Sequence, residues 1–194
     1  MTNHRGATLD RHTERLMSAL RACQRTFGER ADPPEASATG SSLRLSRSNA
    51  VALDLPIAEM VADFLAGRLF LPSGLRASIA CTMQEAVLNA VLHGNLAITD
   101  KSRGACAAAE DLGREIEARL ADPAVAARRC EIRIRWTAAA IVVRVSDEGA
   151  GFVPAALRAD PALPHGRGIA IIMALTAGAR WTCGGRSLLM RFAR

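Results

Sequence analysis

Apolar and polar residues repeat with two different periods along this chain, and these periods predict which segments are helices and which are strands. Apolar residues return every three or four positions over residues 56–70 and again over 75–93, which predicts two amphipathic or buried helices. Residues 130–136 and 139–147 alternate with a period of two and predict a pair of strands joined by a short turn. Residues 168–178 are typical of a buried helix, and 179–182 with 187–192 of a closing hairpin.

The first third of the chain predicts a helix, a linker and two short strands. An amphipathic helix is expected near residues 9–27, followed by a Pro-, Ser- and Gly-containing flexible linker that ends at residue 42. The folded domain is expected over 43–194, with short strands at "LRL" (43–45) and "VALDL" (51–55) and an inserted, exposed helix within about 99–129. This order predicts an α/β (α+β) two-layer sandwich, in which helices pack on one face of a mixed sheet.

A polar stripe runs along the helix predicted over 75–93. Glu85, Asn89 and His93 recur every four residues, and the same row meets Thr82 and Ser78 further back. The remaining surface of this helix is almost entirely apolar, so the stripe is expected to be at least partly buried. Because an unsatisfied buried polar group costs about 1–3 kcal/mol, either the fold or a ligand must supply partners for the carboxylate and the carboxamide. His93 stands two turns from Glu85, and for it we favour a structural role at the helix end.

Two glycine-containing stretches follow the predicted strands. In "SDEGAGF" Asp147 ends a strand and is followed by Gly149 and Gly151, an arrangement that can present an acceptor and close backbone to the amino group of a base. In "HGRGIAIIM" Gly166 and Gly168 flank Arg167 at the start of a helix, where free N–H groups and positive charge suit a phosphate. Residues 152–164 between them are typical of a mobile lid. Judged alone, the first stretch is more typical of an ordinary turn and the second of a loop that needs glycine only to enter a helix.

Composition removes several classes of protein. The net charge is +6, but the arginines are spread along the sequence and there are few aromatic residues, which argues against nucleic-acid binding. The single lysine, Lys101, lies outside any glycine-rich loop, so a Walker-type P-loop is excluded. The five cysteines are scattered and unpaired in sequence, and no apolar run approaches the ~20 residues of a membrane span. We therefore expect a soluble, unexported, cytoplasmic protein without membrane association.

Taken together, the motifs E-x-x-x-N-A, D-x-G-x-G-F and G-x-G-I resemble the N, G1 and G2 boxes of the GHKL ATP-binding superfamily, which includes gyrase, Hsp90, histidine kinases and MutL. The resemblance covers about residues 43–194 and implies the GHKL (Bergerat) ATP-binding fold. Within the superfamily, "EAVLNAVLHGN", "VSDEGAGF" and "GGRSLLMRF" look most like the bacterial anti-sigma-factor serine/threonine kinases of partner-switching systems.

The resemblance implies ATP and Mg²⁺ as cofactors and assigns roles to individual residues. It implies that Glu85 is the general base, that Asn89 holds Mg²⁺ through its side-chain oxygen, and that Asp147 accepts from the adenine amino group. It assigns the rest of the nucleotide site to Gly149 and Gly151 at the base, Gly166, Arg167 and Gly168 at the phosphates, and Ser187 as a hydroxyl near the adenine.

The function implied is that of an ATP-dependent protein serine/threonine kinase that phosphorylates an anti-sigma antagonist. A sigma factor or a response regulator is a further expected partner, and a homodimer is the expected state. One alternative is a detached catalytic domain of a two-component histidine kinase. Against it, Gln84 stands where many histidine kinases carry a histidine, and His12 is the one candidate acceptor in a segment too short for a dimerisation hairpin. The other alternative is a non-catalytic module whose partner affinity is gated by nucleotide.

Overall fold

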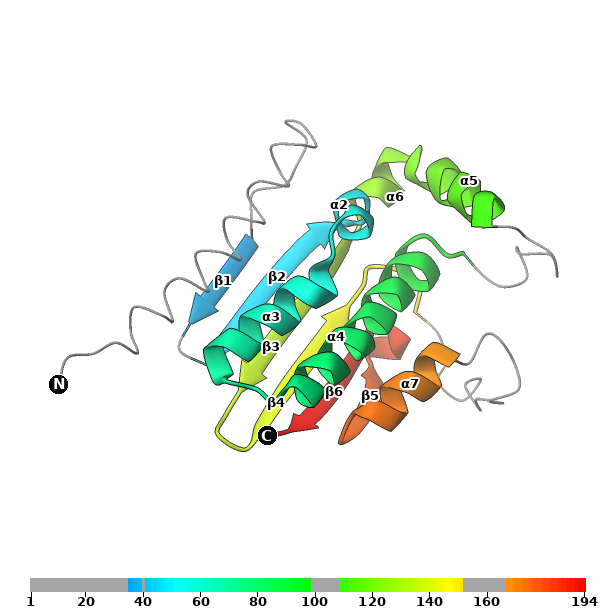
Figure 1. Ribbon diagram of the computed structural model, residues 1–194. Coiled ribbons are helices and arrows are strands. Elements are labelled where there is room, and N and C mark those ends of the chain that lie inside the picture. Colours follow the sequence, from blue (N-terminus) through cyan, green and yellow to red (C-terminus); the bar gives the residue numbers. More distant parts are fainter. Residues whose placement is uncertain (1–34, 40, 99–108, 152–166) are drawn as a thin grey trace.

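Six strands form one sheet in the computed structural model of the chain, which describes residues 35–39, 41–98, 109–151 and 167–194 (Figure 1). The strand order is β1-β2-β3-β4-β6-β5, and every described neighbouring pair is antiparallel. The prediction of a mixed sheet is therefore wrong in strand direction, although the α/β two-layer architecture is confirmed. The strands are β1 (Glu35–Thr39), β2 (Ser42–Ser48), β3 (Arg129–Trp136), β4 (Ala140–Ser146), β5 (Gly178–Thr182) and β6 (Ser187–Ala193).

Helices cover one face of this sheet. In Figure 1, α3, α4 and α7 lie side by side across the same face, while α5 and α6 lie near α2, beyond the end of β2. None of the described helices is long and apolar enough to cross a membrane. Their bounds are α2 (Asn49–Asp54), α3 (Ile57–Leu69), α4 (Ser73–Leu88), α5 (Ala109–Leu120), α6 (Pro123–Ala127) and α7 (Arg167–Leu175). A π-helical segment, η1 (Asn89–Asn95), continues α4, and a 3₁₀ turn, η4 (Cys183–Gly185), joins β5 to β6.

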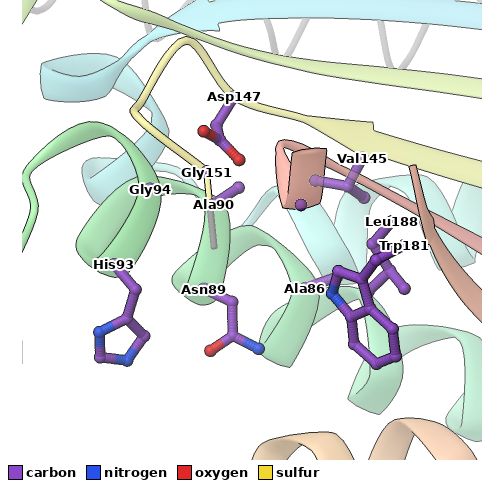
Figure 2. A pocket seen from close by; sticks show the side chains of 11 residues that line it. Ala86, Asn89, Ala90, His93, Gly94, Val145, Asp147, Gly151, Trp181 and Leu188 are labelled. Atoms are coloured by element: carbon purple, nitrogen blue, oxygen red, sulfur yellow. The ribbon is translucent and has the colours of Figure 1, made fainter. Parts of the chain in front are cut away.

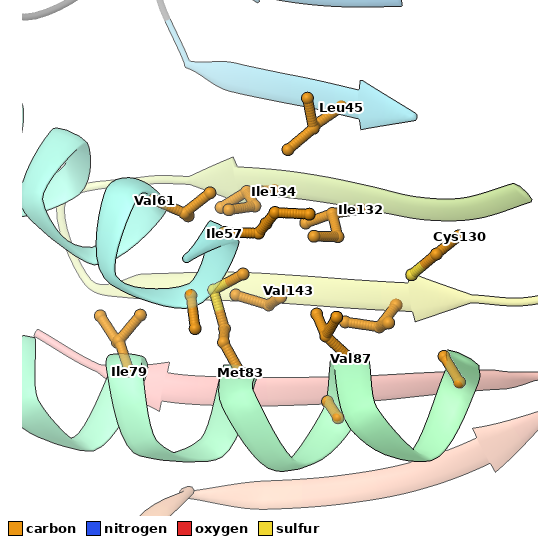
Figure 3. Packing of buried hydrophobic residues seen from close by; sticks show 14 of the residues in the cluster. Leu45, Ile57, Val61, Ile79, Met83, Val87, Cys130, Ile132, Ile134 and Val143 are labelled. Atoms are coloured by element: carbon orange, nitrogen blue, oxygen red, sulfur yellow. The ribbon is translucent and has the colours of Figure 1, made fainter. Parts of the chain in front are cut away.

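The core lies between the helices and the sheet, as the two periods in the sequence require. Along β3 every second residue is buried, and β4 repeats this pattern from Ile141 to Val145. From the other layer, Ile79 and Met83 of α4 and Val61 of α3 are fully buried (Figure 3). Because each buried aliphatic side chain contributes about 1.5–3 kcal/mol, this seam fixes the position of α4 over β4 and β6 (Figure 1). The end of α4 is thereby held at the strand ends where the predicted motifs lie.

The structure corrects four of the predicted elements. "VALDL" belongs mainly to helix α2, which ends before Pro56 because a residue that precedes proline disfavours helical angles; Leu55 is extended. Residues 35–39, predicted as linker, form β1 and pair with β2. The helix predicted over 75–93 changes from α to π at Asn89 and ends at Asn95 rather than at Gly94. The single inserted helix is two helices, α5 and α6. The helix predicted near residues 9–27 and the lid predicted over 152–164 lie outside the described residues.

Candidate nucleotide-binding site

An open pocket lies where the end of α4 meets the ends of β4 and β6. The π-helix forms one side of the pocket, the Asp147 loop another, and the β5–β6 hairpin a third (Figure 2). The lining combines two small alanines and two aliphatic side chains with a carboxylate, a carboxamide and an imidazole. The lining residues are Ala86, Asn89, Ala90, His93, Gly94, Val145, Asp147, Gly151, Trp181, Gly185 and Leu188.

The π-helix begins at Asn89 and places this residue and His93 on the pocket. Its closing bond runs from the backbone N–H of Leu96 to the carbonyl of Val91 (2.8 Å), five residues back. Nδ1 of His93 lies 2.6 Å from the carbonyl oxygen of Ile98, and because that oxygen can accept but not donate, Nδ1 carries the proton. This bond supports the helix-end role favoured for His93. The carboxamide of Asn89 has no hydrogen-bond partner among the described residues, and it faces the pocket.

Asp147 follows the last residue of β4 and presents its carboxylate to the pocket. Its backbone N–H donates to the carbonyl of Arg186 (3.0 Å), and its Oδ1 accepts from the backbone N–H of Gly149 (2.9 Å). Burial raises the pKa of Asp147 above its usual range, while the Gly149 bond and the nearby Arg186 guanidinium lower it in part. One carboxylate oxygen is thus oriented by the loop, and the other is available to a ligand that donates.

Glycine is required at this loop because the backbone segments approach too closely for a Cβ atom. A Cβ built on Gly149 would lie 2.0 Å from the carbonyl oxygen of Gly94, and one on Gly94 would lie 2.5 Å from Cγ of Asp147. Gly151 has φ of +78°, and its Cβ would meet the carbonyl oxygen of Gly184 at 2.3 Å. The structure thus places Asp147, Gly149 and Gly151 in one tightly packed loop beside the pocket, and it adds Gly94, whose packing role sequence reasoning missed.

Glu85 lies one turn before Asn89, at the junction of α4 and α7, and does not line the pocket itself. A Cβ on Gly168, in the first turn of α7, would lie 2.4 Å from Oε2 of Glu85, so the carboxylate packs directly against the glycine backbone. The structure therefore joins Glu85 to Gly168, two residues predicted from separate motifs. Gly166 and the side chain of Arg167 lie outside the described residues.

Ser187, which is predicted to lie near the base, does not line the pocket. Val145 and Leu188 are paired across β4 and β6 and both line the pocket. Their neighbours Ser146 and Ser187 form the next pair, and side chains alternate between the faces of a sheet, so both serines point to the opposite face. There the Ser187 hydroxyl is buried and lies 2.8 Å from the Ser146 hydroxyl.

Two further features of the site were missed by sequence reasoning. Trp181 of the edge strand β5 is the cross-strand partner of Leu188 and lines the pocket beside it; the register of the hairpin would have placed it there. Asn95, fully buried, donates from Nδ2 to Oδ1 of Asn49 (2.7 Å) and accepts at Oδ1 from the backbone N–H of Glu148 (2.8 Å). This asparagine ties the Asp147 loop to the end of the π-helix.

The pocket fits a nucleotide base and a hard cation. The Asp147 carboxylate can accept from an exocyclic amino group, the glycines allow close approach of a flat ring, and Ala86, Ala90 and Leu188 offer apolar contact. The Asn89 oxygen is of the type that Mg²⁺ prefers, and such an ion usually takes its remaining ligands from phosphates and water. Fold and pocket together define an ATP-binding domain of the two-layer α/β type.

Comparison with known families identifies the class further. Residues 48–192 match the family HATPase_c_2, the histidine kinase-like ATPase domain. The match spans about three quarters of the 194 residues, and the chain belongs to this family. A search among curated proteins gave no match.

Proposed function

We propose that this chain is an ATP-dependent protein serine/threonine kinase of the anti-sigma type, which phosphorylates an anti-sigma antagonist in a partner-switching system. The observation that carries the proposal is the arrangement of Glu85 and Asn89. Asn89 lines the pocket. The Glu85 carboxylate lies one helical turn away and contacts Gly168 in the first turn of α7. A base beside the end of a nucleotide pocket is the placement that phosphoryl transfer to a hydroxyl requires.

Each residue has a stated part in this proposal. Asp147 accepts from the adenine amino group, and Asn89 holds Mg²⁺, which neutralises phosphate charge when bound. Glu85 orients the acceptor serine and takes the proton from its hydroxyl; the serine oxygen then bonds to the γ-phosphorus as the bond from that phosphorus to ADP breaks. The backbone N–H groups at Gly168, with Gly166 and Arg167, bind phosphate oxygens.

Two measurements test the proposal in order. Calorimetric titration of ATP, with and without Mg²⁺, is expected to show binding by the wild type that Asp147→Asn loses, because the replacement presents an amide donor to the adenine amino group. Glu85→Gln is expected to keep its ATP affinity within about threefold but to transfer phosphate at least about 100-fold more slowly to a purified antagonist protein. Transfer by Glu85→Gln at the wild-type rate would refute the assignment of the base.

The acid stability of the phosphorylated product and the residue that carries the phosphate distinguish the proposal from its alternatives. Acid-stable phosphoserine or phosphothreonine on the antagonist supports the proposal, whereas acid-labile phosphate on His12 identifies a histidine kinase. ATP binding without transfer to any partner identifies a nucleotide-gated binding module. A homodimer is part of the proposal, and sedimentation of the full chain with and without MgATP tests it.

A further inference from the structure

Arginines gather on the face of the sheet opposite α3, α4 and α7. On β2–β6, whose side chains the structure describes, the strand residues that alternate with the core positions form this face. This face carries seven arginines and one glutamate. Its formal charge is therefore +6, which equals the formal net charge of the whole chain. We call it the basic face; its charged residues are Arg44, Arg129, Arg133, Arg135, Arg144, Arg180, Arg191 and Glu131.

The strand register sets some of these arginines directly opposite one another. Arg44 pairs with Arg133, and Arg133 pairs with Arg144 on the next strand. Neighbouring strands are about 4.8 Å apart, and like charges directly opposite each other destabilise a sheet. A folded domain gains nothing from such a row by itself, whereas an anionic partner would relieve the repulsion.

Glu131 compensates only part of this charge. Its carboxylate accepts hydrogen bonds from Nε of Arg44 and Nε of Arg133. Although burial raises the pKa of Glu131, these two guanidinium groups bring it below its usual range, so the carboxylate is already ionised and occupied. No described carboxylate forms an ion pair with the other arginines that point outward from the middle of the sheet and from its β5 edge, Arg135, Arg144, Arg180 and Arg191.

The centre of the basic face is apolar. Val142 pairs with Arg135 on one side and Arg191 on the other, and Leu189 lies between Arg144 and Arg180. Aliphatic groups framed by arginines are typical of protein–protein interfaces, in which arginine is enriched. On β2–β6 the face carries no aromatic side chain on which a base could stack, as sites for single-stranded nucleic acid do.

We propose that the basic face binds an acidic, partly apolar segment of a protein partner. Acidic side chains of the segment would pair with Arg135, Arg144, Arg180 and Arg191, and its apolar residues would cover Val142 and Leu189. The basic face lies across the sheet from the nucleotide pocket, so this proposal stands independently of the kinase assignment.

Fluorescence anisotropy with the full-length chain tests the proposal. The probe is a labelled peptide of repeating Glu-Glu-Leu, compared with polyglutamate of equal charge and with a DNA duplex. Arg135→Glu combined with Arg191→Glu reverses two exposed charges that frame Val142. The control, Arg114→Glu combined with Arg119→Glu, makes the same change in net charge on the exposed face of α5. The Glu-Glu-Leu peptide is expected to bind the wild type, about tenfold more weakly to the first variant, and within about twofold of wild type to the control.

Four results would overturn the proposal. Equal weakening in both double variants would mean that only net charge matters. Equal affinity for polyglutamate and for the Glu-Glu-Leu peptide would mean that apolar residues of the segment do not contribute to binding. Tighter binding of the duplex than of the peptide, lost in the first variant, would make the face a nucleic-acid site. No peptide binding by the wild type at low salt would mean that the face is closed to such a segment, for example by another part of the chain. Circular dichroism and ATP titration of both variants establish that fold and pocket are intact.

Discussion

Asn95 offers the most direct test of how the site is held in place, because the side chain of Asn95 binds the loop that carries Asp147. Nδ2 donates to Oδ1 of Asn49 (2.7 Å) and to the carbonyl of Arg129 (3.0 Å), and Oδ1 accepts from the backbone N–H of Glu148 (2.8 Å). The two backbone partners fix the orientation of the amide, since one can only accept and the other can only donate. The change considered is Asn95→Ala.

The expected cost follows from these three bonds. Each contributes about 1 kcal/mol net, and each buried partner left without a replacement adds to that cost, whereas a water entering the space would reduce it. We expect a loss of about 3 kcal/mol in the free energy of unfolding. For a domain of this size, 1 kcal/mol lowers the melting temperature by about 2–4 °C, so the variant should melt roughly 6–12 °C below the wild type. ATP affinity should also fall, because the anchor of the Asp147 loop is lost.

Thermal and urea unfolding followed by circular dichroism measure this effect. Ser78→Ala is the control: its hydroxyl donates to the carbonyl of Gly74 within α4, and the variant should stay within about 0.5 kcal/mol of wild type. Asn95→Asp keeps the acceptor for Glu148 but places a second oxygen against the carbonyl of Arg129, so it should be no more stable than Asn95→Ala. A melting temperature for Asn95→Ala within about 2 °C of wild type would refute the reasoning that these three bonds anchor the loop.

Three further predictions concern the pocket. Burial raises the pKa of Asp147, so between its unfolded and folded pKa values the folded chain binds more protons than the unfolded chain, and stability falls as the pH rises through the folded pKa. Asp147→Asn should therefore melt above wild type at about pH 7, with the difference shrinking toward about pH 3.5; a constant difference would contradict this. Gly168→Ala should displace only the flexible end of Glu85. We expect the free energy of unfolding to stay within about 1 kcal/mol of wild type and ATP binding to stay intact, while phosphoryl transfer slows at least about tenfold. Unchanged transfer would argue against a role for the position of the Glu85 carboxylate. In Trp136→Phe the remaining tryptophan, Trp181, lines the pocket, so ATP should change its emission with the affinity found by calorimetry; unchanged emission on binding would place the base elsewhere.

The elements that the sequence predicted well are those with a strong period. The alternation of 130–136 and 139–147 gave β3 and β4 to within a residue or two, and the helix expected from 56 to 70 is α3. "VALDL" was misassigned because a short, mainly apolar run fits a strand and a helix equally well. β1 was missed because the alternation in "EASAT" consists of two alanines, which are weakly apolar and uncommon in strands, and its assignment depends on backbone pairing with β2, which the sequence does not display. Polar residues recur every four positions on both sides of the change from α- to π-helix, so the periodicity of the sequence does not reveal the π-helix.

The residues of the candidate site likewise divide into those with a local sequence signal and those without one. Asp147, Gly149 and Gly151 were found because a strand end followed by glycines is a local signal. Trp181 depends on its cross-strand pairing with Leu188, and Asn95 depends on Glu148, 53 residues away in the sequence; both were missed. Physical proximity across strands, rather than residue type, is the information that was lacking.

Strand register therefore decides both faces of the sheet at once. Pairing Val145 with Leu188 puts these two residues into the pocket and sends Arg144 to the basic face. A slip of one residue between β4 and β6 would bring serine and leucine into opposition and exchange pocket walls for polar side chains. The buried row on the helix side opposes such a slip, because Ile141, Val143 and Val145 pack into the core only in this register. The same hydrophobic pattern that builds the core thus also keeps an aliphatic pocket wall on one face and an arginine row on the other.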